Sequence, residues 1–334
     1  MFRYSAGLTA LALCALSGCA SVNRAGPEAP AGVARTTGTI HEDAFYAPSL
    51  GVTKRMVVYL PPSYDRASNR RYPVAYYLHG LSGTETDWIS KGSIDIVADS
   101  LIGHGAPEMI VVLPDGDDGW YTTWTSPVPF ATCADTVHNE SPARYCVASA
   151  RYDDYIAGDV VRYVDETYRT RRDARSRAIG GLSMGGYGAV SLALRHPEIF
   201  GAAASHSGLL APMYAGPHPF VKPTRYATTV EELRANAGGF WSRFQLFWGT
   251  DFDRWRAADP AHLAMTLQGQ NRPLPALFFD VGRDDPYADQ NRAFDAELTR
   301  LGVAHHFAEE PGAHTWQYWT RHVPLSLAWM ASRW

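Results

Sequence analysis

Residues 178–186 read Ala-Ile-Gly-Gly-Leu-Ser-Met-Gly-Gly, and positions 181–185 within them match the pattern Gly-x-Ser-x-Gly. A short apolar run precedes this pattern, and a helical stretch rich in small residues follows it. Glycines at both ends of the pattern allow a tight strand-to-helix turn, from which the hydroxyl of Ser183 would project above a sheet. We therefore interpret Ser183 as a nucleophile. A phosphate-binding loop is the rival interpretation, but neither a following Gly-Lys-Ser/Thr nor a Gly-x-Gly-x-x-Gly register fits here.

Apolar runs and helical patterns alternate on both sides of this turn. The runs that predict strands are 56–60, 74–78, 109–113, 178–180, 201–204 and 276–281, and the stretches that predict helices are 153–168, 184–195, 288–301 and 315–330. Such alternation predicts an α/β fold, with a mostly parallel central sheet and helices on both faces. Residues 209–275 are aromatic and rich in Pro and Gly. We expect them to form a helical excursion over the carboxyl edge of the sheet, inserted before the 276–281 strand.

The partners of a serine nucleophile follow it in such folds in the order acid, then histidine. Asp284 and Asp285 come directly after the 276–281 strand. We favour Asp285 as the acid and keep Asp284 as the alternative. His314 lies in a glycine-bearing loop before the last predicted helix, and we expect it to be the base that activates Ser183.

An oxyanion intermediate requires backbone N–H donors. The residue after the nucleophile, Met184, should supply one of them. The second is expected from Leu81, in the glycine-bearing loop that follows the buried strand 74–78. An ordinary tight turn at His79 and Gly80 is the alternative interpretation of that loop.

The loop after the 109–113 strand is aromatic and acidic, and it is expected on the same side of the sheet as Ser183. We expect four residues near the nucleophile to contact the substrate: His79, Asp115, Trp120 and Tyr121. Composition does not decide whether they would hold an acyl chain, an aromatic acid or a sugar.

The N-terminus predicts export. Arg3 precedes a short apolar run, 8–16, which is too short to span a bilayer. Leu-Ser-Gly-Cys at 16–19 resembles a bacterial lipobox, which implies cleavage after residue 18 and lipidation of Cys19. Residues 19–38 predict a flexible tether, and residues 39–334 the catalytic domain. The resemblance implies a lipid anchor in an outer membrane, facing the periplasm or the cell surface. A cytosolic chain with an apolar start is the alternative.

Cys133 and Cys146 are the two cysteines that remain after the N-terminal pair is assigned to the leader and the lipid. In an exported protein they are expected to form a disulfide, and two free buried thiols are the alternative. Their spacing does not fit a metal site. The chain of 334 residues carries a formal net charge of −4, so nothing suggests a nucleic-acid partner. No cofactor is expected.

Seven motifs in a fixed order support a resemblance to a known family over residues 40–334. They are Val-Tyr-Leu-Pro-Pro (58–62), Tyr-Leu-His-Gly (77–80), Leu-Pro-Asp-Gly (113–116), Gly-Leu-Ser-Met-Gly-Gly (181–186), His-Pro-Glu-Ile-Phe (196–200), Ser-Gly (207–208) and Gly-Ala-His (312–314). With them the chain resembles the esterase D-like esterases of the α/β-hydrolase superfamily. That family includes feruloyl and acetylxylan esterases, small-ester esterases, S-formylglutathione hydrolase and mycolyltransferases.

The resemblance implies a serine carboxylesterase of the α/β-hydrolase fold, with Ser183, Asp285 and His314 as its triad and Leu81 and Met184 as oxyanion donors. The implied substrates are small or aromatic acyl esters, either small molecules or esters linked to a polysaccharide. A feruloyl or acetylxylan esterase is the leading specific alternative. An acyltransferase and a surface binding module without catalysis are weaker alternatives, since candidates for all three triad roles are present.

Overall fold

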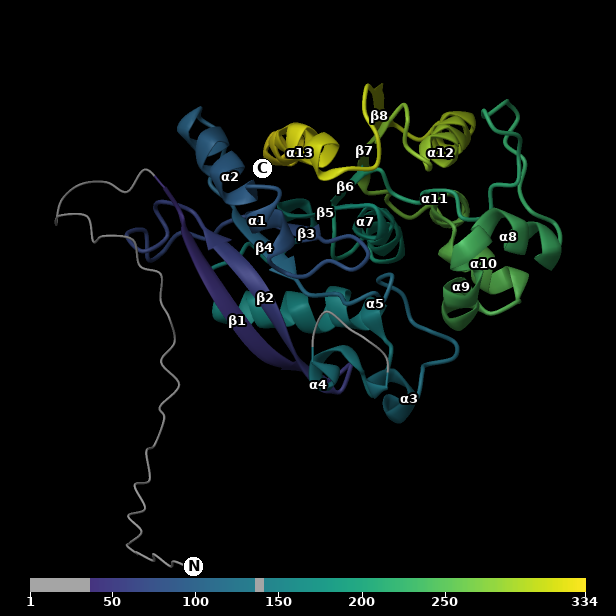
Figure 1. Ribbon diagram of the computed structural model, residues 1–334. Helices are drawn as coiled ribbons and strands as arrows, with labels where there is room; N and C mark the ends of the chain where they lie inside the picture. The colour runs from purple at the N-terminus through teal and green to yellow at the C-terminus, as the bar shows by residue number, and fades with distance from the viewer. Residues whose placement is uncertain (1–36, 136–140) are drawn as a thin grey trace, which may run out of the picture. The chain divides into compact units, whose positions relative to one another are not determined.

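Eight strands form one sheet in the order β1-β2-β4-β3-β5-β6-β7-β8 in the computed structural model, which describes residues 37–135 and 141–334 (Figure 1). The strands are β1 Thr39–Ala47, β2 Val52–Leu60, β3 Val74–Leu78, β4 Ile110–Pro114, β5 Arg177–Leu182, β6 Ala202–His206, β7 Ala276–Gly282 and β8 His305–Glu310. β2 pairs antiparallel with both β1 and β4, and the remaining pairs are parallel. The carboxyl ends of β3 to β8 therefore meet at one edge of the sheet.

Helices cover both faces of this sheet, and each face has its own apolar core. One core contains buried side chains of α1 (Asp87–Ser90), α2 (Ile94–Gly103) and α13 (Trp316–Ala331). The other is formed with α5 (Tyr152–Asp154), the π-helix η1 (Tyr155–Val160), α6 (Val161–Thr167), α7 (Met184–Arg195), α11 (Pro260–Gly269) and α12 (Ala288–Arg300). In Figure 1, α2 and α13 lie on the opposite side of the sheet from α7. This is the expected α/β-hydrolase architecture.

The predicted strands and helices are confirmed to within a few residues, and β3 and α7 have the predicted bounds. β1 was not predicted, because its side chains are mostly exposed or half-buried and show no apolar run. α2 was not predicted either, because it has only two fully buried residues, Ile94 and Ala98. Both elements lie at the margin of the core, where burial leaves a weak signal in the sequence.

The expected excursion occupies the chain between β6 and β7. It contains α8 (Val230–Ala237), the short 3₁₀ helix η3 (Gly238–Phe240), α9 (Trp241–Trp248), α10 (Phe252–Ala258) and α11. Its aromatic side chains largely pack against one another, as Phe244, Trp248 and Trp255 do. The end of α9 contacts the loop after β4, because the Thr125 N–H donates to the Leu246 carbonyl at 3.1 Å. The excursion therefore reaches the carboxyl edge of the sheet.

The loop between β4 and η1 carries α3 (Phe130–Ala134) and α4 (Pro142–Tyr145). The predicted disulfide between Cys133 and Cys146 is formed and joins α3 to the residue that follows α4. The predicted signal peptide, nearly all of the tether and Cys19 lie outside the described residues. Within residues 37–135 and 141–334, no helix combines the length and the apolar character needed to cross a bilayer.

Candidate active site

Ser183 occupies the turn between β5 and α7, with φ 53° and ψ −118°. A non-glycine residue in this region is strained, and such strain is typical of a nucleophile held above a sheet. A Cβ atom at Gly181 would lie 2.5 Å from the backbone of Gly185. A Cβ atom at Gly185 would lie 2.4 Å from the Leu78 carbonyl oxygen. The two glycines are thus required because the strand, the helix and the end of β3 approach one another closely.

The three predicted triad residues lie together at the carboxyl edge of the sheet. His314 Nε2 is 2.9 Å from Ser183 Oγ, and His314 Nδ1 is 2.9 Å from Asp285 Oδ2. The Asp285 side chain is fully buried, whereas that of His314 is 25% exposed. The second oxygen of Asp285 accepts the Tyr287 N–H at 2.9 Å, which fixes the carboxylate. The arrangement can carry a proton from Ser183 to the ring while the acid holds the ring in orientation.

Asp284, the alternative acid, points elsewhere. It is exposed, and its described role is through its backbone, whose N–H donates to the Gly312 carbonyl at 2.9 Å. The structure therefore places Asp285, rather than Asp284, against His314.

The two predicted oxyanion donors flank the nucleophile. Within the described part of the chain, neither the Leu81 N–H nor the Met184 N–H has a hydrogen-bond partner in the protein. Met184 is the first residue of α7, and the first N–H groups of a helix have no intrahelical acceptor. The Leu81 loop packs on the nucleophile turn, since a Cβ atom at Gly80 would lie 2.6 Å from Leu182 Cδ1. Two free donors beside Ser183 fit an oxyanion hole.

His79 orients the peptide that carries the Leu81 N–H. Its Nδ1 lies 2.8 Å from the Gly80 carbonyl oxygen, and its Nε2 lies 2.9 Å from the Gly116 nitrogen. A carbonyl can only accept and a backbone N–H can only donate, so these bonds require a neutral ring with the proton on Nδ1. In a trans peptide the N–H points away from the carbonyl. Holding the Gly80 carbonyl on the His79 side therefore turns the Leu81 N–H to the other side.

The predicted substrate contacts of the β4 loop are wrong. Asp115, Trp120 and Tyr121 are at most 2% exposed. Trp120 packs on Phe244 of α9 with ring centroids 5.0 Å apart, and the Tyr121 hydroxyl donates to the His79 carbonyl at 3.0 Å. His79 is equally buried. The loop after β4 therefore turns its aromatic rings into the core. There these side chains support the buried side of the oxyanion loop, which is the loop of residues 79–83 that carries Leu81.

Lys54 belongs to the same group of supporting residues, and it was not predicted from the sequence. It lies on β2, its side chain is fully buried, and its ammonium bridges the carboxylates of Asp115 and Asp117. Burial lowers the pKa of Lys54, but the two carboxylates outweigh burial and raise it to about 12. Burial and the neighbouring Asp115 raise the pKa of Asp117 to about 7. Despite burial, the Lys54 charge holds the pKa of Asp115 well below its usual range.

A second Ser-His-Asp arrangement lies beneath the site. His206 Nδ1 is 2.8 Å from Asp280 Oδ2, and His206 Nε2 is 2.8 Å from Ser326 Oγ. All three residues are at most 1% exposed, so no substrate can reach them. This set instead braces the ends of β6 and β7 against α13, and the His206 carbonyl accepts the Ser183 N–H at 2.8 Å.

Replacing Gly185 with Ala is expected to lower kcat/KM for a simple ester by about 100-fold or more, since displacing a reacting group by about 1 Å costs about that much. The added Cβ atom would lie 2.4 Å from the Leu78 oxygen and 2.5 Å from the His79 oxygen, both of which are backbone atoms. The strand end that leads into the oxyanion loop must therefore shift.

Steady-state kinetics of purified Gly185→Ala measure this effect, with Gly103→Ala as the control. A Cβ atom at Gly103 has no other atom within 4 Å, so that variant should retain wild-type activity. Wild-type activity in Gly185→Ala would show that the close approach is not needed for catalysis.

Comparisons with known proteins give a consistent picture. A model of the family described as "Putative esterase" matches residues 47–330. An esterase of Mycobacterium tuberculosis is 25% identical over 280 residues, which cover 82% of this chain and 55% of that protein. An acetyl esterase of Caldicellulosiruptor saccharolyticus is 24% identical over 257 residues, which cover 77% of this chain and 82% of that protein. The chain thus spans only about half the length of the mycobacterial relative.

A solved structure of a ferulic acid esterase matches with a TM-score of 0.63 and 24% sequence identity. The match covers 89% of this chain and 98% of that chain. At this level of identity the similarity shows a shared fold.

Proposed function

Because this chain belongs to the esterase family whose model covers most of its length, we propose that it is a serine carboxylesterase acting on small or aromatic acyl esters. The observation that carries the proposal is the pair of 2.9 Å contacts that link Ser183 Oγ to His314 and His314 to Asp285. The hydroxyl of serine is a weak nucleophile unless a base removes its proton, and this arrangement supplies the base.

In the proposed reaction, Ser183 Oγ attacks the ester carbonyl carbon while His314 Nε2 takes the hydroxyl proton. The Leu81 and Met184 N–H groups bind the oxyanion of the tetrahedral intermediate. When the intermediate collapses, the bond to the alcohol oxygen breaks and His314 returns the proton to that oxygen. Water then attacks the acyl-enzyme with His314 again as the base, which releases the acid and restores Ser183. Asp285 stays ionised throughout and stabilises the ring when it is positively charged.

Hydrolysis of p-nitrophenyl acetate, butyrate and octanoate tests this proposal directly. We expect turnover that depends on Ser183, and the preference among the three chain lengths then measures how long an acyl group the site accepts. If the protein hydrolyses none of these esters, feruloyl and acetylated-sugar esters are tested next, before a binding role is considered.

A feruloyl or acetylxylan esterase is the leading specific form of this function. The mycobacterial esterase and the acetyl esterase support ester hydrolysis in general, and the ferulic acid esterase shares the fold. Transfer of the acyl group to an alcohol other than water is less favoured, since no described residue points to a second acceptor. A binding module without catalysis is disfavoured by the aligned triad.

We also propose that the protein is exported and held by a lipid on Cys19. The disulfide between Cys133 and Cys146 supports export, because such bonds persist in oxidising compartments. Cells that express the full chain are expected to incorporate labelled palmitate into the wild type but not into Cys19→Ala. Equal labelling of the two proteins would exclude Cys19 as the lipid site.

A further inference from the structure

Two loops at the amino edge of the sheet, where β3 to β8 begin, are rich in arginine. Residues 63–72 lead into β3, and residues 165–177 connect the end of α6 to the start of β5. Together they contain eight of the chain's 30 Lys and Arg residues but only four Asp or Glu residues. The chain as a whole is acidic, with a formal net charge of −4. Positive charge is therefore concentrated at the edge opposite Ser183.

Backbone hydrogen bonds hold the two loops side by side. The Tyr72 N–H donates to the Arg169 carbonyl at 2.8 Å, and the Arg171 N–H donates to the Tyr72 carbonyl at 2.8 Å. The Arg71 guanidinium donates to the Thr170 carbonyl at 3.2 Å, which links the loops a third time. The arginines of both loops therefore share one continuous part of the surface.

Most of these arginines have no carboxylate partner. Arg70 is paired with Glu108 and Arg177 with Asp165, and the Arg169 guanidinium lies over a tyrosine ring. The other five are exposed and form no ion pair among the described residues: Arg66, Arg71, Arg171, Arg172 and Arg175. We call these five residues the arginine surface.

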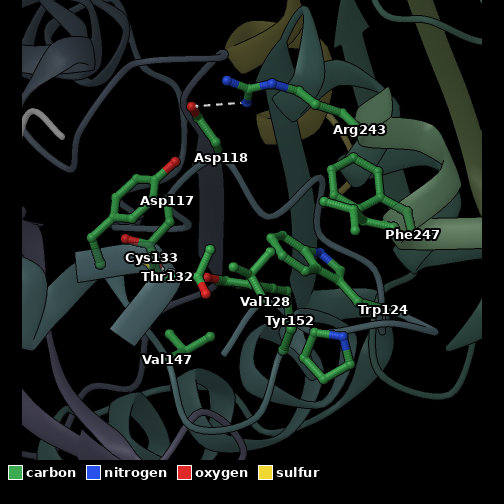
Figure 2. A pocket seen from close by; sticks show the side chains of 14 residues that line it. Asp117, Asp118, Trp124, Val128, Thr132, Cys133, Val147, Tyr152, Arg243 and Phe247 are labelled. Atoms are coloured by element: carbon green, nitrogen blue, oxygen red, sulfur yellow. Dashed lines mark hydrogen bonds and ion pairs between the residues drawn. The ribbon is translucent and has the colours of Figure 1, made fainter. Parts of the chain in front are cut away.

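The pairing differs at the carboxyl edge. The side chain of Arg243 in α9 is 44% exposed there, and Asp118 binds it at 3.1 Å in the pocket shown in Figure 2. The exposed carboxylates of the two amino-edge loops are fewer than the unpaired arginines, namely Asp65, Glu166 and Asp173. The arginine surface therefore keeps an excess of positive charge.

The chain enters the described domain beside this surface. Thr39, at the start of β1, pairs with Leu60 at the end of β2, and the 63–72 loop begins three residues further along. The Gly38 N–H donates to Asp99 of α2 at 2.7 Å, which fixes the entry point. Ile40, the next residue of β1, is 42% exposed. An apolar side chain thus stands in solvent near the arginines.

The length of the preceding segment limits how far a lipid on Cys19 could lie from this edge. Thr39 is twenty positions after Cys19. A flexible chain of that length has an r.m.s. end-to-end distance of about 25 Å. Ser183 lies beyond the other end of β5, whose six residues span about 20 Å. A lipid on Cys19 would therefore bring the amino edge, rather than the active site, to the bilayer.

Anionic phospholipids have the chemistry that this surface lacks. A guanidinium binds phosphate oxygens through two parallel hydrogen bonds. Each basic residue near an anionic bilayer strengthens binding by about five-fold. An exposed apolar side chain such as Ile40 can enter the boundary between headgroups and acyl chains, and a lipid combined with a basic surface anchors a protein more firmly than either alone.

From these observations we infer that the arginine surface binds the anionic phospholipid headgroups of the membrane that holds the protein. The inference rests on the proposed lipid on Cys19, which identifies the partner. It gives the enzyme an orientation, with the amino edge on the bilayer and Ser183 facing the aqueous compartment. The active site then acts on esters that arrive from solution or on a polysaccharide, rather than on the lipids of its own membrane.

Co-sedimentation with vesicles tests this inference on the full chain carrying Cys19→Ala, which cannot be lipidated there. That protein is expected to bind vesicles of phosphatidylethanolamine and phosphatidylglycerol, and to bind vesicles of phosphatidylcholine far more weakly. Adding Arg171→Gln and Arg175→Gln should lower the partition coefficient on the anionic vesicles by roughly 25-fold, about five-fold for each charge. High salt should weaken the binding as well, because it screens exposed charges.

The matched control adds Arg234→Gln and Arg254→Gln instead. These exposed arginines lie on α8 and α10, away from the amino edge, and their replacement removes the same net charge. This variant should bind the anionic vesicles as the parent does. Both double variants should keep the parent's kcat/KM on p-nitrophenyl acetate, which shows that the fold and the active site are intact.

Two results would overturn the inference. One is equal binding of the parent to anionic and to phosphatidylcholine vesicles. The other is an equal loss in the two double variants, since net charge rather than the arginine surface would then explain binding. Neither depends on catalysis, because Ser183→Ala should bind vesicles as its parent does. Palmitate labelling tests the lipid separately, so an unlabelled chain that binds anionic vesicles through Arg171 and Arg175 would disprove the lipid and retain the surface.

Discussion

Ser183→Ala is expected to lose about 10⁴- to 10⁶-fold in kcat on p-nitrophenyl acetate, the range found when the nucleophile of a serine hydrolase is removed. The reason is specific to this site. Ser183 Oγ is the atom that His314 contacts at 2.9 Å, and no other hydroxyl is described within hydrogen-bond distance of that nitrogen. The oxyanion donors remain in the variant, so a residual rate about 10³-fold above that in water is expected.

Steady-state kinetics of the purified full chain measure this loss of kcat, and Ser90→Ala is the control. Ser90 is an exposed serine at the end of α1, and its removal should leave kcat unchanged. Circular dichroism should be the same for all three proteins, because Ser183 Oγ is bonded only to His314 among the described residues. A Ser183→Ala variant with more than a tenth of wild-type turnover would contradict the assigned nucleophile.

The centre of the fold could be predicted from the sequence because its strands are buried on both faces. The runs that became β3 and β4 consist of five residues each, all of them buried, and such runs leave a continuous apolar signal. β1 could not be predicted in this way, because it is an edge strand whose polar side chains face solvent. Its position follows from pairing with β2, which is a tertiary contact.

The triad could be predicted because each member has a fixed place in the chain order and follows a recognisable strand or glycine loop. The residues that support the oxyanion loop from its buried side could not be predicted. Trp120 and Tyr121 follow a strand at the correct edge, but the sequence does not show that their φ angles are 53° and 52°. Lys54 could not be predicted from motifs either, because its partners lie 61 and 63 residues further along the chain, in the loop after β4.

Lys54→Met should be the most destabilising of the substitutions considered, with a loss of about 3–5 kcal/mol in the free energy of unfolding. The Met side chain keeps the apolar stem but removes the charge that both Asp115 and Asp117 contact. Those two side chains are 1% exposed, so water cannot replace the ammonium. Two buried carboxylates would then remain without a cation. Removing one partner of a buried ion pair lowers stability by more than the intact pair contributes, because the remaining charge stays buried and unpaired.

Urea unfolding of the wild type and Lys54→Met measures this loss, and the triple variant Lys54→Met, Asp115→Asn, Asp117→Asn separates charge from packing. If charge is the cause, the triple variant should recover most of the lost stability, because neutral amides have a smaller desolvation cost. If the triple variant is as unstable as the single one, the loss comes from packing and hydrogen bonds instead.

The dependence of this loss on pH gives an independent test of its cause. Without Lys54, burial and mutual repulsion should raise the folded-state pKa values of Asp115 and Asp117 above the unfolded value of about 3.9. The folded variant then binds more protons than its unfolded form, so its stability falls as pH rises above about 4. The loss in the free energy of unfolding, relative to the wild type, should accordingly be larger at pH 8 than at pH 5. A deficit that is equal at both pH values would mean that these carboxylates are not what Lys54 stabilises.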